Sequence, residues 1–148
     1  MRILGVDYGE RRIGIAVSDP TGTIARPVET VAGNASQAAA VTHVLEAIAR
    51  LEQGDDPIAA IVVGLPSRLD GSANDQTARV GAFAALLRAR TDRPVTLQDE
   101  RLTSHEADGR LALRERDWRV RKQRLDAAAA AVILQEYLDA HPQRDPEA

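Results

Sequence analysis

Three acidic residues stand where regular elements are expected to begin or end. Asp7 follows an apolar run, Glu100 follows the last expected strand, and Asp126 lies near the start of the last expected helix. In an open α/β sheet, ligands usually bind at the carboxyl ends of the strands. Acidic side chains at these positions raise the hypothesis of a binding or catalytic site.

Two of these acids have an ordinary explanation when each is taken alone. Asp7 precedes Gly9, and aspartate is common in turns beside glycine. Glu100 lies in the polar stretch 99–101, which could be a solvated loop. Their positions alone do not separate a site from a turn or a loop.

Asp126 is more informative, because an α-helix with about 100° per residue would place it on an apolar stripe. That stripe consists of Ala130, Ile133 and Tyr137. Gln135 and Asp139 are expected to mark the solvent side. A carboxylate on a buried stripe is costly unless it is paired or binds a metal ion. The alternative is that Asp126 complements the dipole at the helix start, which does not require the inward face.

The elements that must position these acids follow from the periodicity of apolar residues. Strands are predicted at 3–6, 13–17, 23–31, 58–63 and 94–98, and helices at 36–53, 75–90, from Thr103 onward, and at 120–138. The first three strands form an antiparallel meander, and helical crossovers between the later strands favour parallel pairing. We therefore predict one α/β domain over residues 1–140, followed by a loose polar tail at 141–148.

Composition narrows the class of protein. The chain of 148 residues has a net charge of -3 and no cysteine, which excludes disulfides and thiolate metal sites. Its longest apolar run, 127–134, is far shorter than the roughly 20 residues of a membrane helix. Its start lacks the apolar stretch of a signal peptide. We expect a cytoplasmic protein without a membrane partner.

The net charge hides an uneven distribution. Residues 110–124 contain seven basic and two acidic side chains, so the rest of the chain is strongly acidic. Like charges held this close repel one another without an anionic partner, which favours contact with phosphates. Trp118, within this segment, could stack on a base. The alternative is a solvated linker between two helices.

Four motifs in order resemble the bacterial pre-16S rRNA nuclease family, also called Holliday junction resolvase-like. They are DYGERRIGIAVSD at 7–19, VVGLP at 62–66 followed by DGS at 70–72, DERLTS at 99–104, and Lys122 with LDAAAA at 125–130. Thr77, Ala78 and Arg79 also fit the family pattern. The resemblance covers about residues 1–140, and it implies a ribonuclease H-like fold with a five-stranded mixed sheet flanked by helices.

The resemblance also implies a chemistry. Asp7, Glu100 and Asp126 would form an acidic triad that binds two Mg²⁺ or Mn²⁺ ions for phosphodiester hydrolysis, since hard cations prefer oxygen ligands. Lys122 could neutralise the scissile phosphate. The residues predicted to contact nucleic acid are Arg12, Arg79, Arg101, Arg119, Arg121 and Lys122. Ser18 and Thr103 could hydrogen-bond the edges of the site, or serve only as turn and cap residues.

The implied substrate is structured RNA, specifically the 5′ end of pre-16S rRNA, with a four-way DNA junction as the alternative. Related junction resolvases carry a fourth carboxylate where this chain has Ala129. Resolvases also act as dimers, whereas this sequence shows no clear apolar dimer stripe, so a monomer is expected. Two other classes stay open: an ATPase of the actin and sugar-kinase type, and a non-catalytic RNA-binding module. The short chain disfavours the first, and the complete triad disfavours the second.

Overall fold

Alternating apolar residues build a five-stranded sheet that is covered on both faces by helices. The computed structural model describes residues 1–33, 36–66, 75–99 and 118–142. The elements in chain order are β1 (Arg2–Asp7), β2 (Arg12–Ser18), β3 (Ala25–Ala32), α1 (Gln37–Glu52), β4 (Ile58–Leu65), α2 (Asp75–Arg90), β5 (Val95–Asp99) and α4 (Trp118–Ala140). In the described part of the chain, no helix is both long and apolar enough to span a membrane.

The strand order is β3-β2-β1-β4-β5. β2 pairs antiparallel with both β1 and β3, whereas β4 pairs parallel with β1 and with β5. The predicted mixed sheet with three antiparallel strands is therefore confirmed. Because β1, β4 and β5 run in the same direction, their carboxyl ends meet at one end of the sheet.

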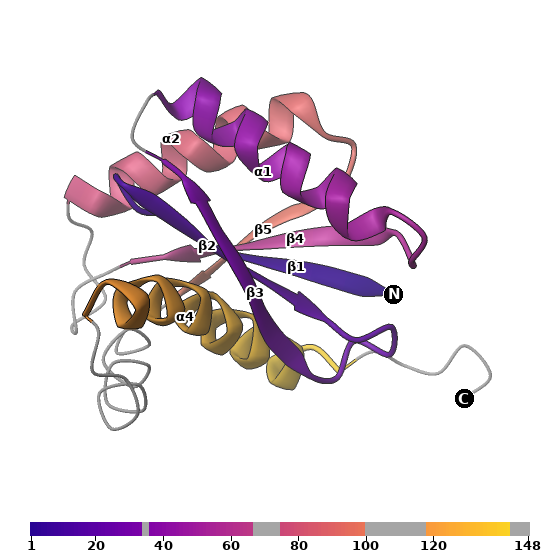
Figure 1. The fold of residues 1–148 in the computed structure, drawn as a ribbon. Helices are drawn as coiled ribbons and strands as arrows, with labels where there is room; N and C mark the ends of the chain where they lie inside the picture. The colour runs from indigo at the N-terminus through magenta and orange to yellow at the C-terminus, as the bar shows by residue number, and fades with distance from the viewer. Residues whose placement is uncertain (34–35, 67–74, 100–117, 143–148) are drawn as a thin grey trace.

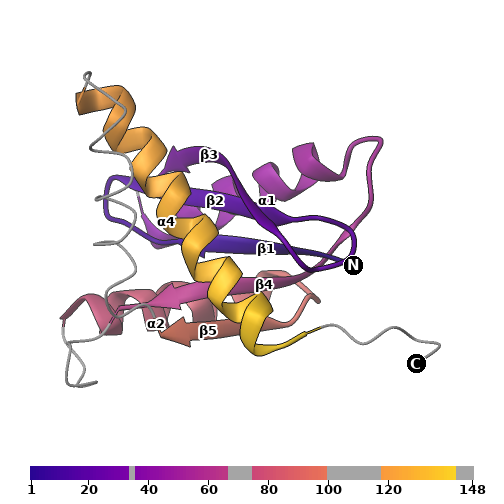
Figure 2. The same ribbon diagram turned by 90° about the horizontal axis from the view of Figure 1, so that it is seen from below.

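The two faces of the sheet have separate cores. α1 and α2 cover one face, and α4 crosses the other face diagonally (Figures 1 and 2). Side chains alternate along a strand, so Leu4 and Val6 of β1 join the core beneath α1 and α2, whereas Ile3 joins the core beneath α4. The same rule assigns each site residue on a strand to one face.

Glycines let α4 lie against the sheet backbone. A Cβ atom added at Gly5 would lie 2.8 Å from the Cβ of Leu134, and one added at Gly14 would lie 1.9 Å from the carbonyl oxygen of Asp126. A glycine inside a strand often marks such a close approach of another backbone. Any side chain at position 14 would push α4 away from β2.

The predicted boundaries agree with the structure to within two residues: β3 begins two residues later than predicted, β4 ends two residues later, and α4 is longer at both ends. The side chain of Ser36 caps α1 by accepting a hydrogen bond from the backbone N–H of Ala39, as expected for a helix beginning there. α4 begins at Trp118 and ends at Ala140, two residues beyond the predicted helix at each end. The helix predicted from Thr103 lies outside the described residues.

The expectation that Gln135 faces solvent was wrong. Its amide nitrogen donates to the carbonyl of Thr23, and its amide oxygen accepts from the backbone N–H of Ala25, each at 2.9 Å. Residues 23 and 25 lead into the edge strand β3, and α4 also packs over this strand. A helical wheel shows only one buried direction, whereas α4 contacts several strands across a twisted sheet.

Candidate active site

The structure brings Asp7 and Asp126 together from the two ends of the chain. Asp7 pairs with Gly14 in the β1–β2 ladder, so the two residues share a face of the sheet. The space where Gly14 would carry a side chain is taken by the backbone of Asp126. Both carboxyl-bearing residues are partly buried. The acid at the end of β1 and the acid on α4 therefore lie side by side across one glycine.

The helix dipole does not explain Asp126. Because α4 begins at Trp118, Asp126 lies more than two helical turns from its N-terminus, and no acid occupies the first turn. The dipole effect falls off within the first turn. The structure removes the alternative that Asp126 only complements a helix start.

Arg12 forms an ion pair with one of these two acids, Asp126. Its Nε donates a hydrogen bond to Oδ2 of Asp126 at 3.0 Å, and each side chain is 27% exposed. Arg12 lies two residues before Gly14 on β2, so alternation points it to the α4 face. Arg12 was predicted to contact nucleic acid, and in the structure its guanidinium is engaged by an acid of the site.

The first turn of α2 ties two neighbouring loops to this end of the sheet. Gln76 Nε2 donates to the carbonyl of Tyr8 at 3.5 Å, and Thr77 Oγ1 donates to the carbonyl of Pro66 at 2.5 Å. Arg79, another predicted nucleic-acid contact, forms an exposed ion pair with Glu10. These contacts hold the segments that follow β1 and β4 next to Asp7.

Several predicted site residues lie outside what the structure describes. Glu100, Arg101 and Thr103 are outside the described residues. Arg119, Arg121 and Lys122 have a described backbone within α4 but undescribed side chains. Lys122 precedes Asp126 by four residues, so its backbone position lies one turn earlier on the same side of the helix. Glu100 directly follows Asp99, the last residue of β5.

The suggestion that Ser18 borders the site was wrong. Its hydroxyl accepts from the backbone N–H of Ile3 at 2.8 Å and donates to the carbonyl of Asp19 at 3.0 Å. These partners lie at the start of β1, and Asp7 lies at its end. Because β1 and β2 are antiparallel, the last residue of β2 lies at the far end of the sheet from Asp7. Ser18 is a structural residue.

The donor set fits a hard divalent cation in part. Asp7 and Asp126 offer carboxylate oxygens, the ligand type that Mg²⁺ and Mn²⁺ prefer. Within the described ranges, no group of three or more His, Cys, Asp or Glu side chains could hold a metal ion. The predicted third acid, Glu100, lies outside the described residues.

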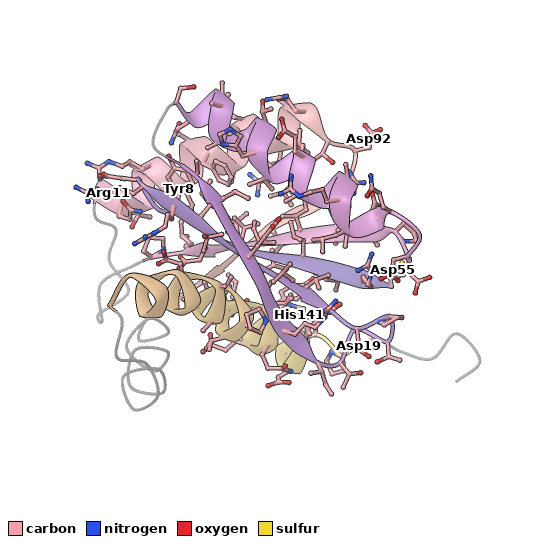
Figure 3. The ribbon with its side chains drawn as sticks, viewed as in Figure 1. Tyr8, Arg11, Asp19, Asp55, Asp92 and His141 are labelled. Carbon is pink, nitrogen blue, oxygen red and sulfur yellow. The ribbon has the colours of Figure 1, made fainter. Side chains whose placement is uncertain are left out.

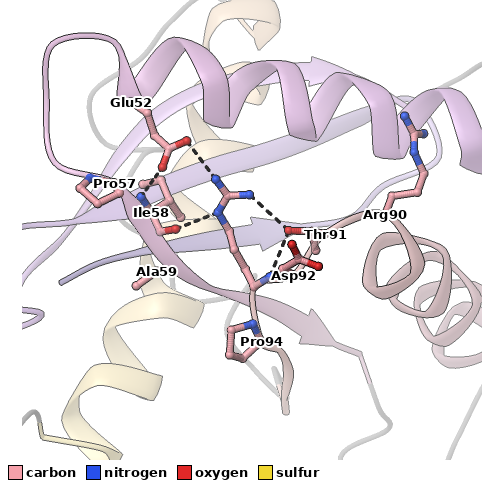
Figure 4. A pocket seen from close by; sticks show the side chains of 9 residues that line it. Glu52, Pro57, Ile58, Ala59, Arg90, Thr91, Asp92 and Pro94 are labelled. Atoms are coloured by element: carbon pink, nitrogen blue, oxygen red, sulfur yellow. Dashed lines mark hydrogen bonds and ion pairs between the residues drawn. The ribbon is translucent and has the colours of Figure 1, made fainter.

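A cavity at the far end of the sheet from Asp7 is lined by residues that hold elements together. Its volume is about 500 Å³, and it lies where α1 and α2 end and where β4 and β5 begin (Figure 4). Arg93 donates there to the carbonyl of Ile58 at 2.8 Å, to Glu52 at 2.9 Å and to Thr91 at 3.2 Å. Its guanidinium is thus occupied by the protein's own acceptors, which leaves little for an added anion.

Sequence reasoning missed one residue of the site region, Gly14, and Arg11 lies at the same end of the sheet without a described contact to either acid. Gly14 sets the distance between α4 and β2, and the available signal was a glycine inside a strand. Arg11 is exposed at the end of the sheet that carries Tyr8 (Figure 3), and no hydrogen bond or ion pair is formed by its side chain among the described residues.

Comparisons with known proteins find related sequences over nearly the whole chain. The family model described as "RuvX: Holliday junction resolvase" matches residues 1–140. A protein of Anaeromyxobacter dehalogenans strain 2CP-C, named "Putative pre-16S rRNA nuclease", is 43% identical over 141 residues, covering 94% of this chain and 97% of the relative. A protein of the same name from Pelotomaculum thermopropionicum is 37% identical over 147 residues, covering 98% and 92%.

Among solved structures, T. thermophilus RuvC in complex with a Holliday junction substrate is similar in fold. The TM-score is 0.50 with 18% sequence identity, and the match covers 96% of each chain. This likeness extends over nearly the whole chain and confirms the predicted ribonuclease H-like fold.

Proposed function

This chain belongs to the RuvX family of Holliday junction resolvase-like proteins, and we propose that it is a metal-dependent nuclease acting on structured RNA in the cytoplasm. The proposed reaction is hydrolysis of phosphodiester bonds at the 5′ end of pre-16S rRNA, during ribosome biogenesis. The observation that carries the proposal is the juxtaposition of Asp7 and Asp126 across Gly14. The names of the relatives support the choice of substrate.

The roles of the residues follow from their positions. Asp7 and Asp126, with Glu100 as the third acid, would hold Mg²⁺ or Mn²⁺. When bound, two such ions would supply activation of the attacking water and stabilisation of the leaving oxygen. Asp7 is held by the β1–β2 ladder, and the contact at Gly14 holds Asp126. Lys122, one helical turn before Asp126, is proposed to neutralise the scissile phosphate.

The second candidate substrate is a four-way DNA junction, which the description of the family model favours. Against it stands Ala129, at the position where related resolvases carry a fourth carboxylate. Ala129 is only 2% exposed in the packed helix. Arg101, Arg119 and Arg121 are proposed to contact the nucleic acid of either substrate.

The direct test incubates the purified protein with a pre-16S rRNA fragment and with a DNA four-way junction, each with Mg²⁺, Mn²⁺ or EDTA. We expect RNA cleavage that needs a divalent ion. Asp7→Asn, Glu100→Gln and Asp126→Asn should each reduce the rate at least about 100-fold, because losing even a residue that supports a metal ligand costs about 10- to 100-fold.

A matched control is Asp139→Asn, which changes an exposed aspartate on the same helix and should leave the rate unchanged. Cleavage that persists in EDTA, or in Asp7→Asn, contradicts the metal-nuclease proposal. Efficient cleavage of the junction with none of the RNA moves the assignment to DNA.

A further inference from the structure

The ion pair between Arg12 and Asp126 points to a role for Arg12 in controlling the metal site. Asp126 is a proposed metal ligand, and its Oδ2 atom accepts a hydrogen bond from Arg12 Nε at 3.0 Å. A guanidinium and a divalent cation are both attracted to the same carboxylate charge. The inference rests on the proposed function, because it takes Asp126 to be a metal ligand.

The contact follows from the packing of the sheet and the helix. Arg12 lies on the α4 face of β2, two residues from Gly14, where the backbone of Asp126 touches the strand. With each side chain 27% exposed, the pair is partly sheltered from solvent. Shelter weakens screening by water and salt, so the pair interacts more strongly than a fully exposed one.

The charge of Arg12 affects how the two acids interact when no metal ion is bound. The carboxylates of Asp7 and Asp126 belong to residues that lie on either side of Gly14, and their like charges repel each other. Arg12 supplies one positive charge at the place where a bound metal ion would supply two. Its charge stabilises the metal-free arrangement of the acids, and the same charge opposes entry of a second cation.

We propose that Arg12 is a positioning residue that holds Asp126 in the metal-free site, and that this ion pair breaks when a divalent cation binds. Arg12 thereby keeps the acids in place for the metal and lowers the affinity of the empty site. Once released, its guanidinium is available to a phosphate of the substrate.

The test measures Mn²⁺ affinity of the full chain by calorimetry, without nucleic acid. Arg12→Gln should bind Mn²⁺ about fivefold more tightly than the wild type, because the metal ion no longer has to displace the ion pair. A fivefold change in affinity corresponds to the free energy that a well-formed, partly exposed ion pair contributes. Its metal-free form should melt at a lower temperature, and saturating Mn²⁺ should raise its melting temperature by more than it raises that of the wild type.

Arg11→Gln is the matched control, because it removes the same charge from the adjacent residue without breaking a described ion pair. Its Mn²⁺ affinity should stay within about twofold of the wild type, reflecting only screened long-range charge. In an Asp126→Asn background, Arg12→Gln should no longer tighten Mn²⁺ binding, because Arg12 acts through that carboxylate.

Equal or weaker Mn²⁺ binding by Arg12→Gln overturns the inference, as does an equal gain in Arg11→Gln. If Arg12→Gln does not fold, the wild type provides the test: the Arg12 Nε–H resonance should shift as Mg²⁺ is added. A resonance that is unchanged at saturating Mg²⁺ rejects the displacement. If Arg12→Gln binds Mn²⁺ more tightly and Arg11→Gln does not, but no protein cleaves RNA, only the proposed function is refuted. If RNA is cleaved normally but Arg12→Gln does not bind Mn²⁺ more tightly, only the role of Arg12 is refuted.

Discussion

The two ends of the sheet differ in how far backbone groups bind their charged side chains, although both ends contain ion pairs, such as Arg93–Glu52 where β4 and β5 begin. At the site end, where β1, β4 and β5 finish, the charged side chain of Asp126 is met by another charged side chain, Arg12. At the support end, where these strands begin, Arg2 is 3% exposed and donates to the backbone carbonyls of Leu51 and Asp56. Asp19 there accepts from backbone N–H groups. Arg11 lies at one end and Asp19 at the other (Figure 3).

The difference bears on which contacts a ligand could replace. Backbone partners cannot leave without unfolding the chain, so the bonds of Arg2 join the end of α1 and the segment before β4 to the start of β1. A side-chain partner such as Arg12 can rotate away and be replaced by a metal ion or a phosphate. Substitutions at the support end should therefore change stability, and those at the site end should change binding and catalysis.

The largest expected effect tests the contact that joins α4 to the site end. Gly14→Ala should lower the free energy of unfolding by about 3 kcal/mol, because its methyl group would overlap the carbonyl oxygen of Asp126. It should also reduce RNA cleavage, since α4 must move away from Asp7. Gly81→Ala is the control, because nothing lies within 4 Å of its added Cβ. Chemical denaturation and cleavage assays of both variants make the comparison, and equal stabilities would disprove the close contact.

A smaller effect tests the support end. Arg2→Met should cost about 2 kcal/mol of unfolding free energy, because the carbonyls of Leu51 and Asp56 lose a buried donor. The rate of cleavage per folded molecule should not change. Arg26→Met, at an exposed arginine with no partner described, should leave stability nearly unchanged. A catalytic defect in folded Arg2→Met would break the separation between the two ends.

The next prediction concerns acid stability at the support end. Hydrogen bonds from the backbone N–H of Ile24, the hydroxyl of Thr21 and the backbone N–H of Thr23 hold the pKa of Asp19 well below its ordinary value. A lowered pKa in the folded state stabilises the protein above the unfolded pKa of about 3.9, and this contribution is lost as pH falls through the folded pKa.

Asp19→Asn should consequently be less stable than the wild type at pH 6, with a difference that shrinks as pH falls below about 4. Thermal melts of both proteins between pH 2 and pH 7 measure it. A stability difference that does not vary with pH would show that the carboxylate charge of Asp19 has no part in holding the turn.

The smallest effect on stability is expected at the site end. Arg79→Gln breaks an exposed ion pair with Glu10 and should change the unfolding free energy by less than about 0.5 kcal/mol. If Arg79 contacts a phosphate, the slope of log affinity for RNA against log salt should fall by about one. Arg50→Gln, which breaks the exposed pair with Glu29, is the control and should leave that slope unchanged.

The sequence by itself determined the elements and their order. The two-residue period of strands and the 3.6-residue period of helices are local properties, so β4 and the helix capped by Ser36 could be read from neighbouring residues. The apolar stripe also identified Asp126 as an inward-facing acid, and the motifs singled out Asp7. The packing role of Gly14 could not be predicted from the sequence, because it depends on a helix more than a hundred residues further along the chain.

Only the tertiary structure decided which groups meet. Register and the antiparallel direction of β2 move Ser18 to the support end and bring Gly14 beside Asp7. The diagonal path of α4 makes Gln135 a partner of the backbone near β3 and brings Asp126 within reach of Arg12. Spacing along a chain predicts the face on which a side chain lies, because that follows from local geometry. The partner found on that face depends on how distant elements cross, and this is set by packing across the whole sheet.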